Sequence, residues 1–228
     1  MNRQFRSILG AHPRVHWVAL ILSLHLSELI STPVHGAEAD AELEPAINAV
    51  VMLTGTLDDV TRYGAGIVFG RGEGSLYIVT ADHLVRRGER TMSNLKVRLR
   101  AYPELPLDAV LLDKHRPDLD LALLEVGGLS AKGIDPTAID LHILARPDSL
   151  NSQSRVFPVG NPDNLPWGRS AAPAPGFERQ GDRITFESIA TRKGHSGGGL
   201  IDESGVLIGM VRGTYGTHGQ ARDIQVIT

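Results

Sequence analysis

Short apolar runs separated by Gly, Pro and Asp fill most of the chain beyond residue 45. Each run is rich in Val, Ile and Leu and is shorter than a typical helix, a pattern that favours strands. In the first half of the chain the runs predict strands at residues 50–56, 63–69, 75–80, 95–101, 107–113 and 121–126. Residues 41–49 fit a short helix that leads into the first of them. Such spacing is typical of an all-β sandwich or barrel.

A second series of apolar runs follows a connection over residues 127–148, which contains two turn-like centres. The series predicts strands at residues 154–159, 183–189, 198–201, 206–211 and 224–227. Residues 162–176 are rich in Pro, Gly and Ala, which predicts a surface loop. The pattern therefore predicts an all-β chain with two sets of strands.

Three residues with catalytic potential stand at the ends of apolar runs. His83 follows the run at residues 77–81, Asp120 directly precedes another run, and Ser196 lies in a glycine-rich turn at residues 194–198. A serine hydroxyl is a poor nucleophile unless a base lies beside it, and small neighbours let two backbone N–H groups converge on an oxyanion. The three residues therefore predict a nucleophilic site.

Asp118 competes with Asp120 for the acidic position of this site. It follows Pro117 in a predicted loop, where acidic residues commonly form turns. Asp120 is preferred because it directly precedes a predicted strand. The order His83, Asp120, Ser196 differs from the order in α/β-hydrolases and from that in subtilisins.

Three segments in this order resemble motifs of the trypsin-like, chymotrypsin-fold serine proteases, nearest the cysteine-free bacterial HtrA/Deg-like branch. They read TADHL at residues 80–84, DLALL at residues 120–124 and GHSGG at residues 194–198. A fourth, VGNP at residues 159–162, resembles a segment early in the second barrel of that family. The resemblance implies two six-stranded Greek-key β-barrels with the active site in the cleft between them.

The resemblance also implies roles for the residues of the site. Ser196 would attack the scissile carbonyl to form an acyl-enzyme, His83 would transfer the protons, and Asp120 would orient His83. The backbone N–H groups of Gly194 and Ser196 would form the oxyanion hole. These roles imply a serine endopeptidase that acts on a protein or peptide substrate and needs no cofactor and no metal.

Substrate preference is less well indicated. By the family pattern, Ala190 lies at the base of the first substrate pocket, and Arg212, Gly213 and Thr214 border it and pair with the substrate backbone. A neutral base argues against a requirement for Lys or Arg and favours small or aliphatic residues. The nearby residues Thr191, Arg192, Lys193 and Arg212 leave open a preference for acidic residues like that of the glutamyl endopeptidases.

Three residues depart from the family pattern. His195 stands where asparagine is usual, Asp82 directly precedes the proposed base, and Gly199 stands where proline is common. His195 and Asp82 add two titratable groups beside the site. Either they tune the pH dependence of catalysis, or their side chains point away from the cleft, because adjacent residues of an extended backbone face opposite sides.

Composition narrows the possible partners. The 228 residues are 42% hydrophobic, which suits a globular chain, and the formal net charge is −3. This charge gives no basis for nucleic-acid binding or for attraction to an anionic membrane. The chain has no cysteine, so disulfides cannot stabilise it, and its histidines lack the spacing of metal ligands.

The N-terminal stretch has the composition of a secretory signal peptide. Arginines precede the apolar run at residues 17–26, and an A-x-A pattern follows at residues 37–39. The run is short for a membrane span, and His25 and Glu28 interrupt it. We therefore expect a secreted or periplasmic protein with no stable membrane insertion after cleavage. The expected segments are a signal peptide over 1–39 and a protease domain over 40–228, with barrels at about 46–127 and 150–228.

Two other classes of protein stay open at this point. A binding module with a protease fold would keep the same residues but hold a collapsed oxyanion loop. An α/β-hydrolase-type esterase would place helices between parallel strands and a histidine after the nucleophile.

Overall fold

The computed structural model describes residues 43–139, 141, 154–169, 177–180, 183–186, 191–215 and 223–227. For residues 177–180, 183–186, 214–215 and 223–227 it describes the backbone alone. The predicted signal peptide and Ala190 lie outside the described residues.

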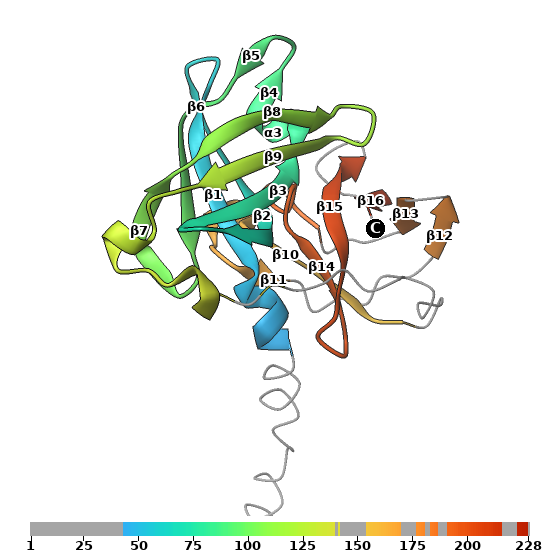
Figure 1. Ribbon diagram of the computed structural model, residues 1–228. Helices are drawn as coiled ribbons and strands as arrows, with labels where there is room; N and C mark the ends of the chain where they lie inside the picture. The colour runs from blue at the N-terminus through green and yellow to red at the C-terminus, as the bar shows by residue number, and fades with distance from the viewer. Residues whose placement is uncertain are drawn as a thin grey trace, which may run out of the picture. The chain divides into compact units, whose positions relative to one another are not determined.

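The first half of the chain forms one antiparallel sheet of seven strands in the order β7-β6-β1-β2-β3-β9-β8 (Figure 1). The strands are β1 Val50–Leu57, β2 Val60–Gly72, β3 Ser75–Ala81, β6 Ser93–Leu99, β7 Tyr102–Asp108, β8 Val110–Arg116 and β9 Leu121–Val126. The two edge strands, β7 and β8, are separated by Ala109 alone. The two edges of the sheet are therefore consecutive in the chain, so the sheet is curved where β7 leads into β8.

The second half forms another antiparallel sheet of seven strands in the order β11-β10-β14-β15-β16-β13-β12. The strands are β10 Val156–Gly160, β11 Gly168–Arg169, β12 Phe177–Gln180, β13 Arg183–Phe186, β14 Gly199–Asp202, β15 Leu207–Tyr215 and β16 Asp223–Ile227. Its edge strands are again consecutive in the chain. The all-β fold class is confirmed, and the antiparallel pairing excludes an α/β-hydrolase.

Several short elements were not predicted. A one-turn helix, α3 Asp82–Val85, follows β3, and a small hairpin joins β4 Arg86–Arg87 to β5 Arg90–Thr91. Strand β7 carries prolines at positions 103 and 106, which its place at the sheet edge tolerates. The other unpredicted elements are the 3-10 turns η1 Ser130–Lys132, η2 Pro136–Ala138 and η4 Pro162–Asn164, and β11 inside the predicted loop. The short helix predicted over residues 41–49 is confirmed for residues 43–48.

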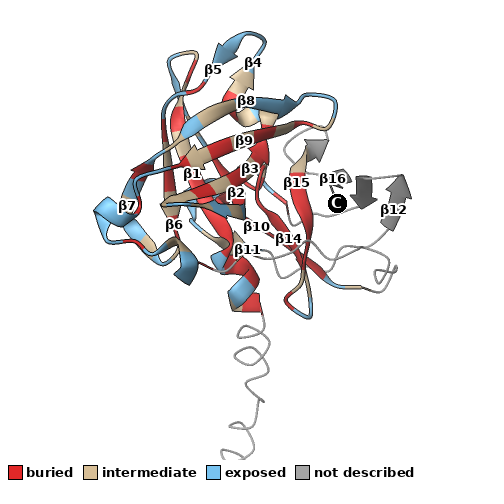
Figure 2. Ribbon diagram, viewed as in Figure 1, coloured by how far each residue is buried: buried red, intermediate tan, exposed pale blue. Residues whose placement is uncertain are grey.

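Strand β1 is buried on both faces and supplies two apolar clusters (Figure 2). Its residues Val51 and Leu53 belong to the core enclosed by the first sheet. The alternate residues Val50 and Met52 belong to a second cluster, which contains buried side chains of both sheets. From the second sheet this cluster takes Phe157, Val159, Ile201, Leu207 and Met210. The alternation of side chains along one strand thus packs the two halves of the chain together.

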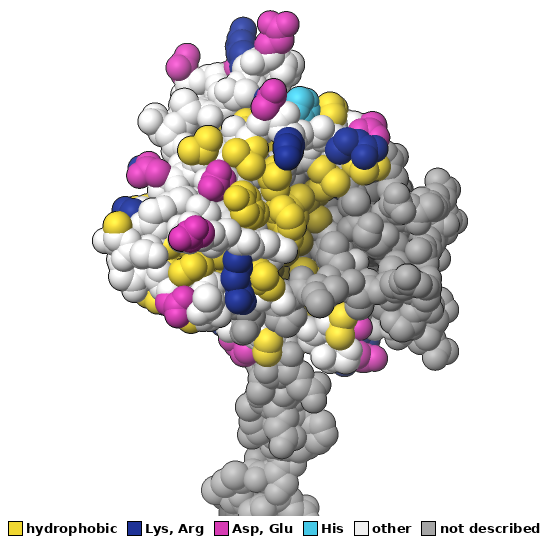
Figure 3. Space-filling view, in the orientation of Figure 1, with side chains coloured by type: hydrophobic (Ala, Val, Ile, Leu, Met, Phe, Trp, Pro, Cys, Tyr) yellow, Lys and Arg dark blue, Asp and Glu magenta, His cyan; other side chains and the backbone are white. Residues whose placement is uncertain are grey.

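Alternate residues of strands β3 and β9 also contribute to the two different clusters. Ile78 and Leu124 are fully buried in the first core, whereas Val79 and Leu121 are half-buried against the cluster shared by the two sheets. On the side of the molecule seen in Figure 3, hydrophobic side chains gather in the middle and charged side chains lie around them. This packing holds the end of β3 and the start of β9 beside the second sheet. His83 lies just after the end of β3, and Asp120 lies just before the start of β9.

Candidate active site

His83 and Asp120 are joined by a dense set of hydrogen bonds. His83 Nδ1 lies 2.7 Å from Asp120 Oδ2, and the backbone N–H of His83 donates to Asp120 Oδ1 at 2.9 Å. The backbone N–H of Asp82 donates to the carbonyl oxygen of Asp120, also at 2.9 Å. Asp120 adopts a φ of +57°, a conformation that Asp tolerates better than most residues and that lets its carboxylate and carbonyl both face α3. The imidazole is thus held in one orientation.

Opposing effects set the protonation of Asp120. Burial by itself raises the pKa of this carboxyl, but the hydrogen bonds and charge of His83 and the nearby Arg212 guanidinium outweigh burial and lower the pKa. Arg212 Nε lies 3.3 Å from Asp120 Oδ2 and comes from β15 in the second sheet. Asp120 therefore stays ionised, as an acceptor for His83 Nδ1–H.

Ser196 lies in a turn that is docked on the first sheet. Its carbonyl oxygen accepts the backbone N–H of Ala65 at 3.1 Å, and the N–H of the next residue, Gly197, donates to Val211 O at 2.7 Å. Gly197 has a φ of +79°, and a Cβ there would lie 2.1 Å from Ala65 O and 2.4 Å from Thr80 Oγ1. Only glycine fits this position, so Gly197 allows the turn to dock in the way that positions Ser196.

The backbone just before Ser196 leaves two donors free. Gly194 has a φ of +106°, and its carbonyl oxygen accepts the N–H of Asn161 at 2.9 Å. The N–H of His195 donates to Arg192 O at 3.2 Å. Within the described residues, the N–H groups of Gly194 and Ser196 have no hydrogen-bond acceptor. These are the two groups that the sequence assigned to an oxyanion hole, and an oxyanion would find both unoccupied.

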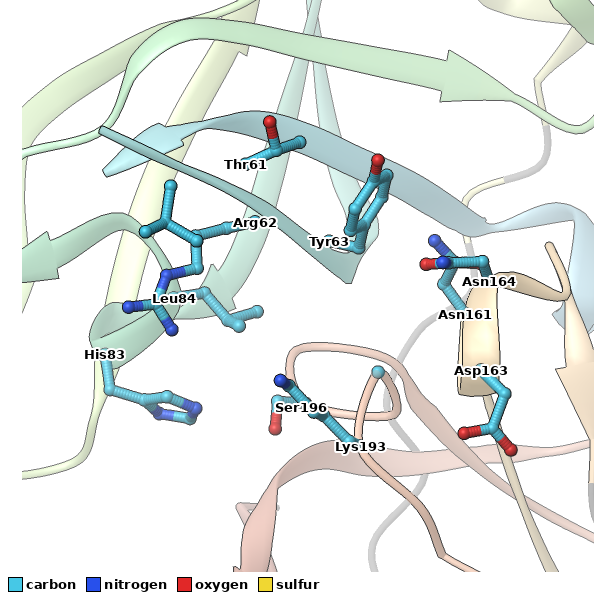
Figure 4. A pocket seen from close by; sticks show the side chains of 12 residues that line it. Thr61, Arg62, Tyr63, His83, Leu84, Asn161, Asp163, Asn164, Lys193 and Ser196 are labelled. Carbon is cyan, nitrogen blue, oxygen red and sulfur yellow. The ribbon is translucent and has the colours of Figure 1, made fainter. Parts of the chain in front are cut away.

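His83 and Ser196 line the same cavity, which has a volume of about 440 Å³. The His83 ring points toward Ser196 across it (Figure 4). No hydrogen bond joins the two side chains among the described residues, and such catalytic bonds often tighten only in the substrate complex. The structure thus brings His83, Asp120 and Ser196 together, whereas Asp118 is exposed and pairs with Arg116 at 2.7 Å.

The sequence pattern of the trypsin-like peptidase domain matches residues 64–210. The chain belongs to this family. The matched segment contains His83, Asp120 and Ser196 and most of both sheets.

Solved structures show the same fold at low sequence identity. The trypsin-like domain resembles the HtrA-type protease AlgW in a complex with a tripeptide, with 22% identity and a TM-score of 0.66 over 83% of this chain and 60% of that one. It resembles a serine endoprotease from Yersinia pestis with 20% identity and a TM-score of 0.61 over 82% of this chain and 61% of that one. The chain thus spans about 60% of the length of these structures. No curated protein sequence matches it.

Of the four predicted substrate-binding residues, the structure describes Arg212, Gly213 and Thr214. Ala190 lies outside the described residues. Gly213 and Thr214 lie on β15 and pair with β16, opposite Gln225 and Ile224. The Arg212 side chain is turned to Asp120, so it is engaged within the trypsin-like domain.

His195 does not line the cavity. Its side chain is 2% exposed, and Nδ1 accepts the backbone N–H of Arg192 at 2.9 Å. The same Nδ1 lies 3.1 Å from Arg192 O, and Nε2 is buried without a partner in the described part of the chain. Burial lowers the pKa of His195. Asp82 lies 3.3 Å from Arg86, and burial raises the pKa of its carboxyl.

Sequence reasoning gave no role to several residues of the cavity, above all Arg62, Asn161 and Asp163, and considered Lys193 only as a basic residue near the first substrate pocket. Asn161 lies in the VGNP segment, which could have pointed to it. Arg62 gave no signal because nothing in a strand pattern marks which surface residue faces a cleft.

Two negative observations concern the described residues alone. They contain no group of His, Cys, Asp and Glu side chains that could hold a metal ion. They include no helix long and apolar enough to cross a membrane.

Proposed function

We propose that the chain is a serine endopeptidase that cleaves peptide bonds through His83, Asp120 and Ser196. The observation that carries the proposal is the His83–Asp120 pair, which lines one cavity with a serine held in a glycine turn. Membership of the trypsin-like peptidase domain family supports the same reaction.

The reaction would begin when Ser196 Oγ attacks the scissile carbonyl carbon and gives its proton to His83 Nε2. Asp120 accepts the hydrogen bond from His83 Nδ1 and stabilises the imidazolium that forms. The N–H groups of Gly194 and Ser196 stabilise the tetrahedral oxyanion. His83 then protonates the leaving amine, the acyl-enzyme forms, and a water activated by His83 hydrolyses it.

The pairing of β15 supports an extended peptide as substrate. In the described residues, strand β15 pairs with β14 through Leu207, Gly209 and Met210, and farther along it pairs with β16 at Gly213 and Thr214. Among the described residues, Gly213 and Thr214 are paired on the side of β16, and the acyl side of a substrate would add as a strand on their other side. The bound tripeptide of the AlgW structure is consistent with such a substrate class.

The first substrate pocket would accept small or aliphatic residues, since its proposed base is Ala190. The structure weakens the alternative of an acidic residue at that position, because Arg212 is turned to Asp120. We also propose that residues 1–39 form a signal peptide, that the protease domain spans 40–228, and that the mature protein is periplasmic or secreted.

A fluorophosphonate probe tests the proposed activity, because it reacts only with an activated serine. We expect a covalent label on Ser196 between about pH 6 and 9, no label in Ser196→Ala, and normal labelling in Asp118→Asn. The alternative, a binding module with a protease fold, predicts no label in any variant. A label on Ser196 together with cleavage of a casein-type protein substrate would exclude that alternative.

A further inference from the structure

The cavity beside Ser196 extends away from the proposed acyl-side strand. Its lining comes from the start of β2, from α3, from η4 and from the turn before Ser196 (Figure 4). No described residue of β15 contributes to it. A peptide whose acyl side adds to β15 at Gly213 and Thr214 would therefore continue past Ser196 and Gly194 into this cavity. The cavity lies where the leaving group of the reaction departs.

Two cations line this cavity without an ion pair. Arg62 comes from β2 and Lys193 from the turn before Ser196, and among the described residues neither forms a salt bridge. The carboxylate whose charge Arg62 influences, Asp58, is already held by Arg87 at 2.8 Å and by Arg90 at 2.7 Å. Arg62 Nε is also buried without a hydrogen-bond partner in the described residues, which leaves its demand for an acceptor unmet.

The one carboxylate that lines the cavity among the described residues does not neutralise these cations. Asp163 Oδ2 pairs with Arg192 Nη1 at 2.9 Å. The remaining walls include Val60, Leu84 and Tyr63, which offer apolar contact to an aliphatic stem. The cavity therefore combines an apolar wall with an excess of positive charge, which fits a side chain that ends in a carboxylate.

We propose that Arg62 and Lys193 select substrates with an acidic residue, Glu or Asp, among the first residues on the leaving-group side of the scissile bond. The proposal rests on the proposed peptidase function and names a specificity for its site. It differs from a glutamyl-endopeptidase preference, which concerns the residue on the acyl side. Arg62 and Lys193 act by binding the substrate and take no part in proton transfer.

Digestion of a proteome-derived peptide library by the full chain tests the proposal on many candidate substrates at once. Mass spectrometry of the new termini reports which residues stand before and after each cleaved bond. We expect enrichment of Glu and Asp after the bond for the wild type and its loss in Arg62→Gln with Lys193→Gln. The matched control is Lys114→Gln, which removes an exposed cation outside the cavity and should keep the enrichment.

A peptide pair drawn from the library then measures the size of the effect. For Glu against Gln at the enriched position, we expect kcat/KM to differ about 5-fold, as for partly exposed charge pairs. The difference should fall at 1 M salt, where the screening length is roughly 3 Å. Equal kcat/KM values for the two peptides, or enrichment only before the bond, would overturn the proposal.

Failure of this specificity and failure of the peptidase function give different results. A fluorophosphonate label on Ser196 without acidic enrichment refutes the specificity and leaves the peptidase intact. If no label forms, fluorescence anisotropy with the Glu and Gln peptides still tests the cavity on the wild-type chain. Equal affinities there would refute the role of Arg62 and Lys193, whereas tighter binding of the Glu peptide, lost in the double variant, would support it.

Discussion

Among single residues, Asp120 carries the most interactions of the proposed site. Both of its carboxylate oxygens and its carbonyl oxygen accept hydrogen bonds from residues 82–83, and Arg212 approaches from the other sheet. Its neighbour in sequence, Asp118, is exposed and forms an ion pair with Arg116 on the surface. Two carboxylates two positions apart thus differ completely in surroundings, which makes them a matched pair for mutagenesis.

Replacement of Asp120 by Asn should abolish most of the activity. The amide cannot stabilise an imidazolium and favours the wrong tautomer of His83, so we expect kcat/KM to fall by about 10⁴-fold. Asp118→Asn is the control and should stay within about 2-fold of the wild type, since surface substitutions have small effects. Initial-rate kinetics on one peptide substrate measure both. Comparable losses in the two variants would show that the carboxylate is wrongly assigned.

His195 should make folding stability depend on pH. Burial lowers its pKa in the folded state from the ordinary value of 6.5, so the unfolded chain binds a proton that the folded chain does not. The contribution of His195 to stability is present above pH 6.5 and is lost progressively as the pH falls below it. One such group changes the free energy of unfolding by at most about 1.4 kcal/mol per pH unit.

Urea unfolding of His195→Asn at several pH values checks this expectation. The variant should show a shallower loss of stability below pH 6.5 than the wild type, and His115→Asn, which removes an exposed imidazole, should follow the wild type. Parallel curves for the wild type and His195→Asn would mean that His195 is not the group responsible.

Among the elements, the turn that carries Ser196 depends most on its glycines. Gly197→Ala would force a Cβ to 2.1 Å from Ala65 O, at a φ of +79° that alanine rarely adopts. The hydrogen bond from Ala65 N to Ser196 O would be displaced with it. Because displacements of about 1 Å cost roughly 100-fold in rate, we expect the fluorophosphonate labelling rate of Gly197→Ala to drop by about 100-fold.

Gly70→Ala is the matched control for this turn. It also replaces a glycine by alanine, but its Cβ would meet Tyr77 at 3.6 Å, an ordinary contact. Its labelling rate should equal that of the wild type. A Gly197→Ala variant that labels as fast as Gly70→Ala would show that the turn relaxes without moving Ser196.

Sequence patterns predicted the strands whose residues are continuously apolar or alternate between apolar and polar. They missed the elements whose conformation depends on contacts with distant parts of the chain. Strands β1, β3 and β9 were predicted nearly to the residue because their buried faces repeat regularly. Strand β7 was missed because its two prolines argue against a strand, although an edge strand tolerates them. His83 was expected at a strand end and lies instead in α3, a single turn too short to leave a periodic signal.

The residues of the candidate site also fall into those that local motifs indicated and those that only the folded structure brings together. Local motifs indicated His83, Asp120 and Ser196, since each stands beside a distinctive run of residues. Of the cations of the cavity, Arg62 gave no such signal, and Lys193 was noted only as a basic residue near the first substrate pocket. Their proximity results from the packing of the β2 hairpin against a turn of the other sheet, more than a hundred positions later in the chain.

For the whole molecule, the apolar cluster shared by the two sheets predicts that they unfold together. Trp167 follows η4, in the second half of the chain, and its Nε1 donates to Val50 O of β1 at 2.8 Å. Its fluorescence therefore reports on the contact between the two halves. Far-UV circular dichroism reports on all strands. If the halves depend on each other, the two signals should change at the same denaturant concentration.

Leu124→Ala makes this test decisive, because Leu124 is fully buried in the core of the first sheet alone. Removal of a buried leucine side chain costs about 2–5 kcal/mol. In a Trp17→Phe background, where Trp167 is the only tryptophan of the chain, we expect Leu124→Ala to lower the fluorescence midpoint and the circular dichroism midpoint equally. A second circular dichroism transition that stays at the wild-type denaturant concentration, after the fluorescence has already changed, would show that the second half folds independently, and the shared cluster would then contribute little to the cooperativity of the molecule.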